Sequence, residues 1–203
     1  MKALIFDVGG VLVRTEDRSH RQRLAEELGL SVQELYDAVF HSDAWRLAEL
    51  GRITNDEHWQ AVGRRLGLSR PDEVNAFRAA FFAGDRLDRD LLAFIQQLRG
   101  RYKVALLSNA PDSLRRWIAD EWHIPADTFD AIVASAEVGL AKPDPAIYRI
   151  ALERLGVAPH DALFVDDFAE NVEAARALGM EAIHFTSPEA LMAELGARVE
   201  AQS

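Results

Sequence analysis

Side chains that could hold a metal ion or a phosphate group follow four apolar runs that lie far apart in the sequence. They are Asp7 after 3–6, Ser108 and Asn109 after 102–107, Lys142 in the loop after 131–134, and Asp166 and Asp167 after 162–165. Two carboxylates from different strands make a hard oxygen site suited to Mg²⁺. A hydroxyl beside backbone amides can hold phosphate, and an ammonium offsets charge on a phosphoryl group. Together these residue types indicate phosphoryl chemistry.

Each of these residues also has a purely structural interpretation. The acidic residues could cap turns or helices, the Ser-Asn pair could form a turn, and the lysine could be a solvated loop charge. If the residues were purely structural, all of these interpretations would have to hold at once. A single shared site explains the whole set, in this order along the chain, more simply. Lys142 stands out further, because the other two lysines of the chain, Lys2 and Lys103, open predicted strands.

Alternating strands and helices are predicted for most of the chain. Strands are expected at 3–6, 102–107, 131–134, 162–165 and 182–185. Helices are expected at 88–98, 112–122 and 144–155, in a segment after Asp167 that ends at Gly179, and from 187 onward. This alternation implies an α/β fold with a doubly wound parallel sheet. The carboxyl ends of parallel strands lie on one edge, so the polar residues that follow them are expected to converge there.

A helical segment interrupts this pattern after the first strand. Amphipathic helices are predicted at 18–28, 31–40, 43–50, 54–66 and 71–84, with Thr54 and Glu57 forming a capping box for the fourth. Helices without strands between them indicate a separate bundle. We therefore expect an α/β core domain at 1–13 and 86–203 and an inserted helical domain at 14–85.

Composition narrows the classes of function. The 203 residues can bury an α/β core and a small second module. The chain has no cysteine, which excludes disulfides, thiolate metal sites and cysteine nucleophiles. The net charge of −10 argues against nucleic acid as a partner. Asp7 interrupts the only N-terminal apolar run, and no run is long enough to span a membrane. We expect a cytoplasmic protein that binds a small molecule and no membrane, and the oligomeric state is not predicted.

The ordered motifs resemble those of the haloacid dehalogenase superfamily over essentially the whole chain. Its DxDGT motif matches 7–11, its strand-ending Ser or Thr matches Ser108, its Lys before Pro matches Lys142, and its acidic motif matches 166–167, followed by Asn171. The resemblance implies a Rossmann-like core, and the helical insert looks like the α-helical cap of that family.

The resemblance also implies a role for each motif residue. Asp7 would be the nucleophile that forms an aspartyl-phosphate, and Lys142 would orient it and offset negative charge. Phosphate oxygens would be bound by Ser108 and the Asn109 amide, with Gly10 among the substrate-binding residues. The cofactor would be Mg²⁺, held by Asp7, the Gly9 carbonyl and Asp166, with Asp167 supporting the site.

One residue departs from the family pattern. Phosphatases of the superfamily usually carry a second Asp two positions after the nucleophile, as general acid and base, where this chain has Gly9. Such a group contributes about 10² to 10⁴ in rate. Three outcomes are open: a leaving group that needs no acid, such as an anomeric sugar phosphate; substitution by His41, Glu49 or His58 of the insert; or little hydrolysis at all.

Three functions follow from these alternatives. The preferred one is an Mg²⁺-dependent phosphomonoester hydrolase acting on a small phosphorylated metabolite, with sugar phosphates as one candidate class. A 2-haloacid dehalogenase would use the same Asp and Lys without metal, but the Asp166-Asp167 pair is then hard to explain. A catalytically weak phospho-ligand-binding module is motivated only by Gly9.

Overall fold

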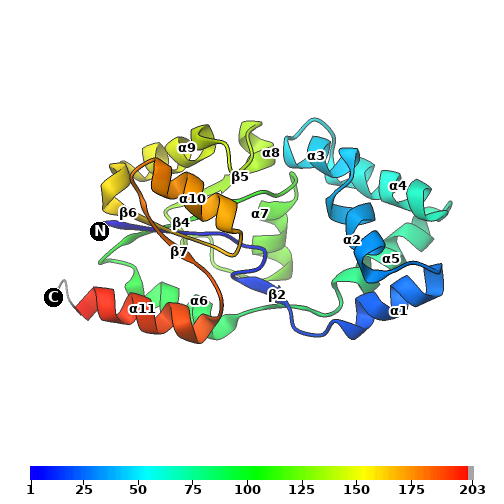
Figure 1. Cartoon of the computed structure of the whole chain (residues 1–203), viewed down its shortest axis with the longest axis horizontal. Helices are drawn as coiled ribbons and strands as arrows, with labels where there is room; N and C mark the ends of the chain where they lie inside the picture. Colours follow the sequence, from blue (N-terminus) through cyan, green and yellow to red (C-terminus); the bar gives the residue numbers. More distant parts are fainter. Residues whose placement is uncertain (201–203) are drawn as a thin grey trace.

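Five parallel strands form the central sheet of the computed structural model, which describes residues 1–200 (Figure 1). They are β1 (Ala3–Phe6), β4 (Lys103–Ser108), β5 (Ala131–Ala134), β6 (Ala162–Asp166) and β7 (Glu181–His184). Their order across the sheet is β5-β4-β1-β6-β7, and each neighbouring pair is parallel. The predicted doubly wound α/β fold is confirmed.

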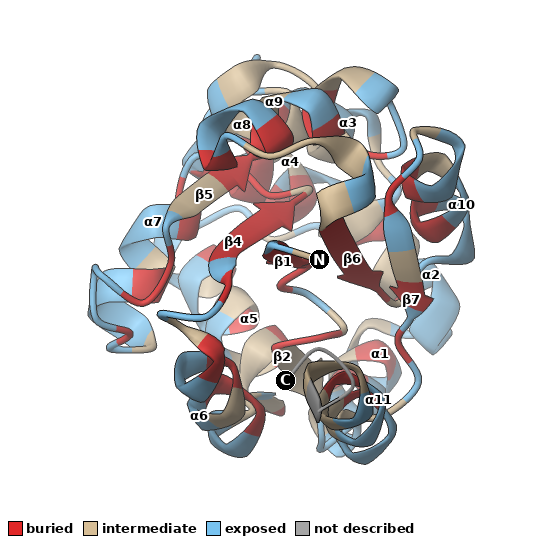
Figure 2. Ribbon diagram, turned by 90° about the vertical axis from the view of Figure 1, so that its left-hand side faces the viewer, coloured by how far each residue is buried: buried red, intermediate tan, exposed pale blue. Residues whose placement is uncertain are grey.

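Helices cover both faces of this sheet (Figures 1 and 2). One face packs against α6 (Arg89–Leu98), α7 (Leu114–Arg116) and α11 (Pro188–Glu200), and the other against α9 (Pro145–Leu155) and α10 (Ala169–Ala177). Two short helices, α8 (Ser135–Val138) and a 3₁₀ turn (Pro159–Asp161), lie in the connections. Burial on both faces explains why the central strands are almost wholly apolar.

The path of the chain through the sheet reverses at β1. From β1 the chain moves outward to β4 and then β5, and it returns to the opposite side of β1 for β6 and β7. Such a reversal opens a crevice at the carboxyl ends of the strands beside it, where α/β proteins bind ligands. The carboxyl ends of β4, β1 and β6 are therefore adjacent.

A bundle of helices faces this edge of the sheet (Figure 1). It contains α1 (Ser19–Leu28), α2 (Val32–Phe40), α3 (Asp43–Glu49), α4 (Asn55–Leu66) and α5 (Pro71–Phe82). The bundle has a hydrophobic core of its own, which includes Leu35, Val39, Trp59, Phe77 and Phe81. The capping box predicted at Thr54 is confirmed, because Thr54 and Glu57 each accept a hydrogen bond from the other's backbone N–H.

An antiparallel ribbon that the sequence did not predict connects the bundle to the sheet. Strand β2 (Val13–Thr15) pairs with β3 (Asp85–Leu87), with Thr15 opposite Asp85. Arg21 of the bundle is buried against this ribbon, and its guanidinium donates to both Asp85 oxygens (2.7 and 2.8 Å). Strands of three residues are too short to show an alternating pattern, and their partners lie about seventy residues apart, which is why the ribbon escaped prediction.

The helix predicted at 112–122 differs from the structure. Only Leu114–Arg116 is α-helical, and Trp117–Glu121 forms a π-helical turn in which the Trp122 N–H donates to the Trp117 carbonyl (2.8 Å). The wider turn lets both indole rings, 6.3 Å apart, pack against the same face of the core.

None of the helices within residues 1–200 combines the length and the apolar character that crossing a bilayer requires.

His58 lies in the interior of the helical bundle. It is fully buried between the rings of Trp45 and Trp59, and neither ring nitrogen has a hydrogen-bond partner among the described residues. Burial, together with the charge of Arg78, lowers the pKa of His58 to about 4. The folded protein therefore holds this imidazole neutral at pH values where the unfolded chain protonates it.

This burial predicts a loss of stability in mild acid. Between the folded pKa of about 4 and the unfolded value of 6.5 the unfolded chain binds more protons, so stability falls as the pH falls through that window. We expect His58 to contribute a loss of about 2 kcal/mol between pH 7 and pH 5. Urea unfolding at both pH values would measure it, with His58→Phe as the comparison. An equally steep pH dependence in His58→Phe would contradict the assignment.

Candidate active site

Asp7 follows directly after β1, at the centre of the sheet edge. Its backbone N–H donates to the Val165 carbonyl (2.9 Å), which continues the pairing with β6. The Val8 N–H donates to its Oδ1 (2.7 Å) and so fixes the carboxylate. Burial raises the pKa of Asp7 above its ordinary value, although the neighbouring Lys142 ammonium opposes this.

Lys142 reaches Asp7 and Asp166 from the loop between α8 and α9. Its Nζ lies 3.0 Å from Asp7 Oδ1 and 2.6 Å from Asp166 Oδ2, and its side chain is almost fully buried. Burial by itself disfavours the charged ammonium, but the two carboxylates outweigh it and raise the pKa of Lys142. The lysine is therefore held as a cation between two acidic groups.

Asn109 holds the loop that carries Lys142. Its side-chain Nδ2 donates to the Lys142 carbonyl (2.9 Å), and its Oδ1 accepts the Lys142 N–H (2.7 Å). These two hydrogen bonds tie the Asn109 side chain to the Lys142 backbone. Ser108 precedes Asn109 at the buried end of β4, paired in register with Ala134.

Asp166 ends β6 and is completely buried. Besides Lys142, it accepts hydrogen bonds from the Phe168 N–H (2.8 Å) and from Asn171 Nδ2, which donates to both of its oxygens (3.0 and 3.1 Å). These donors fix the orientation of the buried carboxylate.

Asp167 lies against Gly10. The glycine has φ +80°, and a Cβ there would lie 2.1 Å from Asp167 Oδ2, so both the backbone conformation and the space require glycine. Asp167 Oδ1 is buried and has no hydrogen-bond partner among residues 1–200. Burial and the negative charges of Asp7 and Asp166 raise the pKa of Asp167 to about 6.

These three carboxylates fit a divalent metal ion. Asp7, Asp166 and Asp167 each offer an oxygen, and the three atoms lie within 4.8 Å of one another. The three negative charges face a single ammonium, and one carboxylate oxygen has no donor within the described chain. Oxygen-only donors of this kind suit Mg²⁺.

Gly9, two positions after Asp7, lies in open space. Apart from Gly9 and its two chain neighbours, no atom of residues 1–200 lies within 4 Å of the place where a Cβ on Gly9 would sit, and its φ is not in the left-handed region. Neither sterics nor backbone conformation therefore requires glycine at this position.

The insert residues considered as substitutes for the acid differ in their surroundings. His41 is exposed and bound to Asp37 on its own helix (2.7 Å), and His58 is enclosed in the core of the bundle. Glu49 ends α3, which packs against α8 of the core, and burial raises its pKa. Gly51, just beyond, has φ +66°, and a Cβ there would lie 2.2 Å from the Ala136 carbonyl oxygen. Of the three, only Glu49 lies on the side of the bundle that touches the core.

Comparison with known families agrees with this arrangement. Residues 1–179 match the model of the haloacid dehalogenase-like hydrolases, which places Asp7, Ser108, Lys142 and Asp166 inside one family domain. The chain belongs to the haloacid dehalogenase-like hydrolase family. The predicted family, fold and enzyme class are thereby confirmed.

Individual members of this family resemble the chain over nearly its full length. It is 33% identical over 199 residues to the sesquiterpene phosphatase astK of Aspergillus oryzae, covering 96% of this chain and 94% of that protein. It is 29% identical over 188 residues to the D-ribitol-5-phosphate phosphatase of Bacteroides thetaiotaomicron, covering 89% and 90%.

A solved structure agrees with these relatives. The crystal structure of a HAD family enzyme from Bacteroides thetaiotaomicron, in complex with magnesium and inorganic phosphate, has a TM-score of 0.75 and 26% identity, covering 92% of this chain and 94% of that one. Metal binding in this family and the named phosphatases support the phosphatase branch of the haloacid dehalogenase-like hydrolases.

Two sets of hydrogen bonds that hold the loops of the site were not predicted from the sequence. The Ser135 hydroxyl accepts the Ala110 N–H (2.9 Å) and donates to the Ala110 carbonyl (3.2 Å), which fixes the loop after Ser108. The side chain of Asn109 holds Lys142, a contact between residues 33 positions apart. Ser135 does follow a predicted strand, but nothing in its local sequence indicates its partner.

The negative charges beside Asp167 predict that Asp167→Asn stabilises the metal-free protein. At pH 7.5 the substitution removes a repelled negative charge, and because water screens this half-buried group in part, we expect about 1 kcal/mol of stabilisation, or about 2–4 °C in Tm. The gain should shrink as the pH falls through 6, since Asp167 then takes up a proton in the folded state.

Thermal unfolding in EDTA and in Mg²⁺ checks this. The unsubstituted protein should gain Tm on addition of Mg²⁺ and Asp167→Asn should gain much less, because it lacks one ligand charge. A variant that is less stable than the parent in EDTA at pH 7.5 would show that repulsion does not dominate at Asp167.

Proposed function

We propose that this hydrolase is an Mg²⁺-dependent phosphatase of a small phosphorylated metabolite. The observation that carries the proposal is the cluster in which Asp7 is held by Lys142 beside Asp166 and Asp167, with an unpaired oxygen on Asp167. Asp7, the Gly9 carbonyl, Asp166 and Asp167 would hold the metal. When bound, Mg²⁺ would neutralise charge on the phosphate and on these carboxylates.

Asp7 is the proposed nucleophile. Its free carboxylate oxygen would attack phosphorus and form an aspartyl-phosphate, while the bond from phosphorus to the leaving oxygen breaks. Water would then attack the phosphorus of this acyl phosphate and break its bond to the Asp7 oxygen, releasing inorganic phosphate and restoring the Asp7 carboxylate. The Val8 N–H on Oδ1 would keep the carboxylate in one orientation throughout.

The remaining residues would stabilise charge on the phosphoryl group. Lys142, a cation held within 3.0 Å of Asp7, would orient the nucleophile and offset the negative charge that accumulates. The Ser108 hydroxyl and the backbone amides of Asn109 and Gly10 would donate to phosphate oxygens. Asn171, which donates to both oxygens of Asp166, is a proposed positioning residue.

The insert at 14–85 is proposed to act as a cap over this site. Its helices face the carboxyl edge of the sheet (Figure 1). Gly51, just after α3, packs against Ala136 of α8. A cover of this kind excludes water and contacts the non-phosphate part of a substrate. The two named relatives, a sesquiterpene phosphatase and a D-ribitol-5-phosphate phosphatase, act on chemically different phosphates.

Two alternative functions are less well supported. A metal-free dehalogenase would leave three carboxylates within 4.8 Å facing one ammonium, at a considerable cost in repulsion. A pure binding module would not need a nucleophile held in place by a buried lysine.

Hydrolysis of p-nitrophenyl phosphate tests the proposal. Its good leaving group needs no acid, so we expect phosphate release that requires Mg²⁺ and falls more than about 1,000-fold in Asp7→Asn, since an amide is not a nucleophile. Asp120→Asn, an exposed carboxylate on the π-helical turn, is the control and should keep full activity. Chloride release from 2-chloropropionate in EDTA, with no phosphatase activity, would instead establish the dehalogenase.

Gly9 predicts a second kinetic property. Without an acid at this position, the protein should hydrolyse glucose 1-phosphate, an anomeric phosphate, far faster than glucose 6-phosphate. Gly9→Asp has open space for its side chain and should raise kcat/KM for glucose 6-phosphate about 100-fold, with little change for p-nitrophenyl phosphate. Gly9→Asn is the matched control without an acid. Equal rates of the parent on both sugar phosphates would contradict this account of Gly9.

A further inference from the structure

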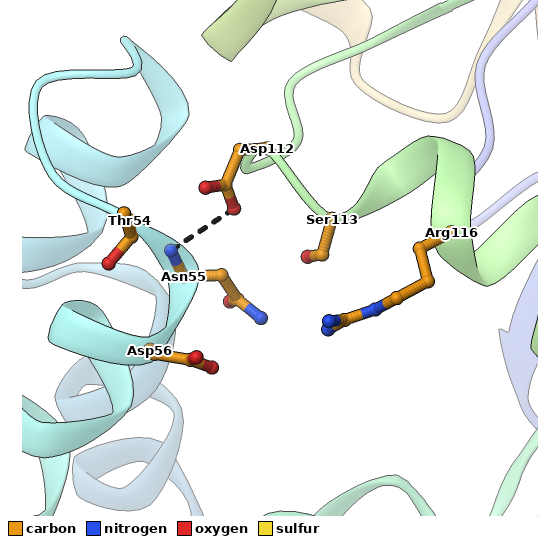
Figure 3. Close-up of a pocket in the computed structure, with 6 residues that line it drawn as sticks. All are labelled: Thr54, Asn55, Asp56, Asp112, Ser113 and Arg116. Carbon is orange, nitrogen blue, oxygen red and sulfur yellow. Dashed lines mark hydrogen bonds between the residues drawn. The ribbon is translucent and has the colours of Figure 1, made fainter.

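A cleft lies where the helical insert meets the core, and none of the clustered carboxylates Asp7, Asp166 and Asp167 lines it. Its volume is about 280 Å³, and it opens between the start of α4 and the loop that leads into α7 (Figure 3). Its lining residues are Thr54, Asn55, Asp56, Asp112, Ser113 and Arg116. This volume is close to the roughly 300 Å³ at which sites for small molecules begin.

Two buried polar groups in the cleft have no partner. Asn55 is 3% exposed and Ser113 is 5% exposed, yet neither Asn55 Nδ2 nor Ser113 Oγ has a hydrogen-bond partner within residues 1–200. Figure 3 shows both side chains pointing into the space between the insert and the core. Buried polar groups in folded proteins are nearly always paired, so a donor and a hydroxyl aimed into one cleft indicate a ligand.

The charged groups around the cleft define the chemistry of that ligand. Arg116 extends its guanidinium from the core toward Asn55, while the Asp56 carboxylate lies on the insert side of the cleft, below Asn55 (Figure 3). The Asp112 carboxylate accepts the Asn55 backbone N–H (3.2 Å) and adds a second negative charge. Two carboxylates disfavour an anion, and a guanidinium disfavours a cation. Hydroxyl groups suit the cleft because each can donate to a carboxylate and accept from an amide or guanidinium.

We propose that this cleft binds adjacent hydroxyl groups of a neutral polyol or sugar. Asn55 Nδ2 and Arg116 would donate to hydroxyl oxygens, Asp56 would accept from hydroxyl protons, and Ser113 Oγ would do both. Asn55 comes from the insert, whereas Ser113 and Arg116 come from the core, so a bound polyol bridges the two parts.

The ligand has two possible sources. Asp112 lies four residues after Ser108 on the same loop, so the hydroxyls could belong to the phosphorylated substrate, an assignment that rests on the proposed function. They could equally belong to a free polyol, which requires no catalysis.

Binding is tested first without phosphate. Backbone amide shifts of the full chain, without metal, would be followed while ribitol, sorbitol or glucose is added at millimolar concentration. We expect shifts at 54–56 and 112–116 with at least one of the three, and at least fivefold weaker binding in Ser113→Ala and Arg116→Gln. Arg64→Gln, an exposed arginine in the last turn of α4, is the matched control and should bind normally.

The variants also separate a ligand site from a packing defect. If the Ser113 hydroxyl is only an imperfectly packed group, Ser113→Ala should keep or raise Tm and leave polyol binding unchanged. That result, or the absence of shifts at the cleft with all three polyols, would overturn the proposal.

Kinetics distinguish the two sources. If the hydroxyls belong to the substrate, Ser113→Ala and Arg116→Gln should raise KM for ribitol 5-phosphate about tenfold and leave kcat/KM for p-nitrophenyl phosphate within twofold. Unchanged KM together with polyol shifts at the cleft assigns the site to a free polyol. A parent protein that binds polyol but never hydrolyses p-nitrophenyl phosphate would refute the proposed function and leave this site standing.

Discussion

The arrangement of the site depends on one buried ion cluster, in which the Lys142 ammonium lies between Asp7 and Asp166. An ammonium or a carboxylate buried alone would lose its hydration and neutralise. Here the opposite charges contact one another, and further donors hold the carboxylates: the Val8 N–H donates to Asp7 Oδ1, and Asn171 donates to both oxygens of Asp166. The cluster therefore forms only when the ends of β1 and β6 and the loop after α8 lie side by side.

The sequence predicted the part of this arrangement that depends on strand ends. Asp7, Ser108 and Asp166 each follow an apolar run, and a parallel sheet brings such positions to one edge whatever their separation along the chain. The bundle was also predictable, because its helices carry local signals such as the capping box at Thr54.

Features that arise from long-range contacts escaped prediction. The β2–β3 ribbon joins three-residue strands with no pattern of their own, and the π-helical turn at Trp117–Glu121 reflects packing against the core. The contact between Asn109 and the Lys142 backbone likewise depends on where two loops meet. In each case the residues involved look ordinary until their partners are known.

The ribbon has a consequence for how such proteins diversify. Because Thr15 and Asp85 are paired, the insert leaves and re-enters the core at neighbouring points. A module whose ends lie side by side can be exchanged for another without rethreading the sheet. Residues 16–84 thus form a replaceable cassette: a bundle of different length or surface could be joined at the same two strands while β1, β4 and β6 keep their register. Such a graft would have to reproduce the Arg21–Asp85 ion pair, which crosses this boundary.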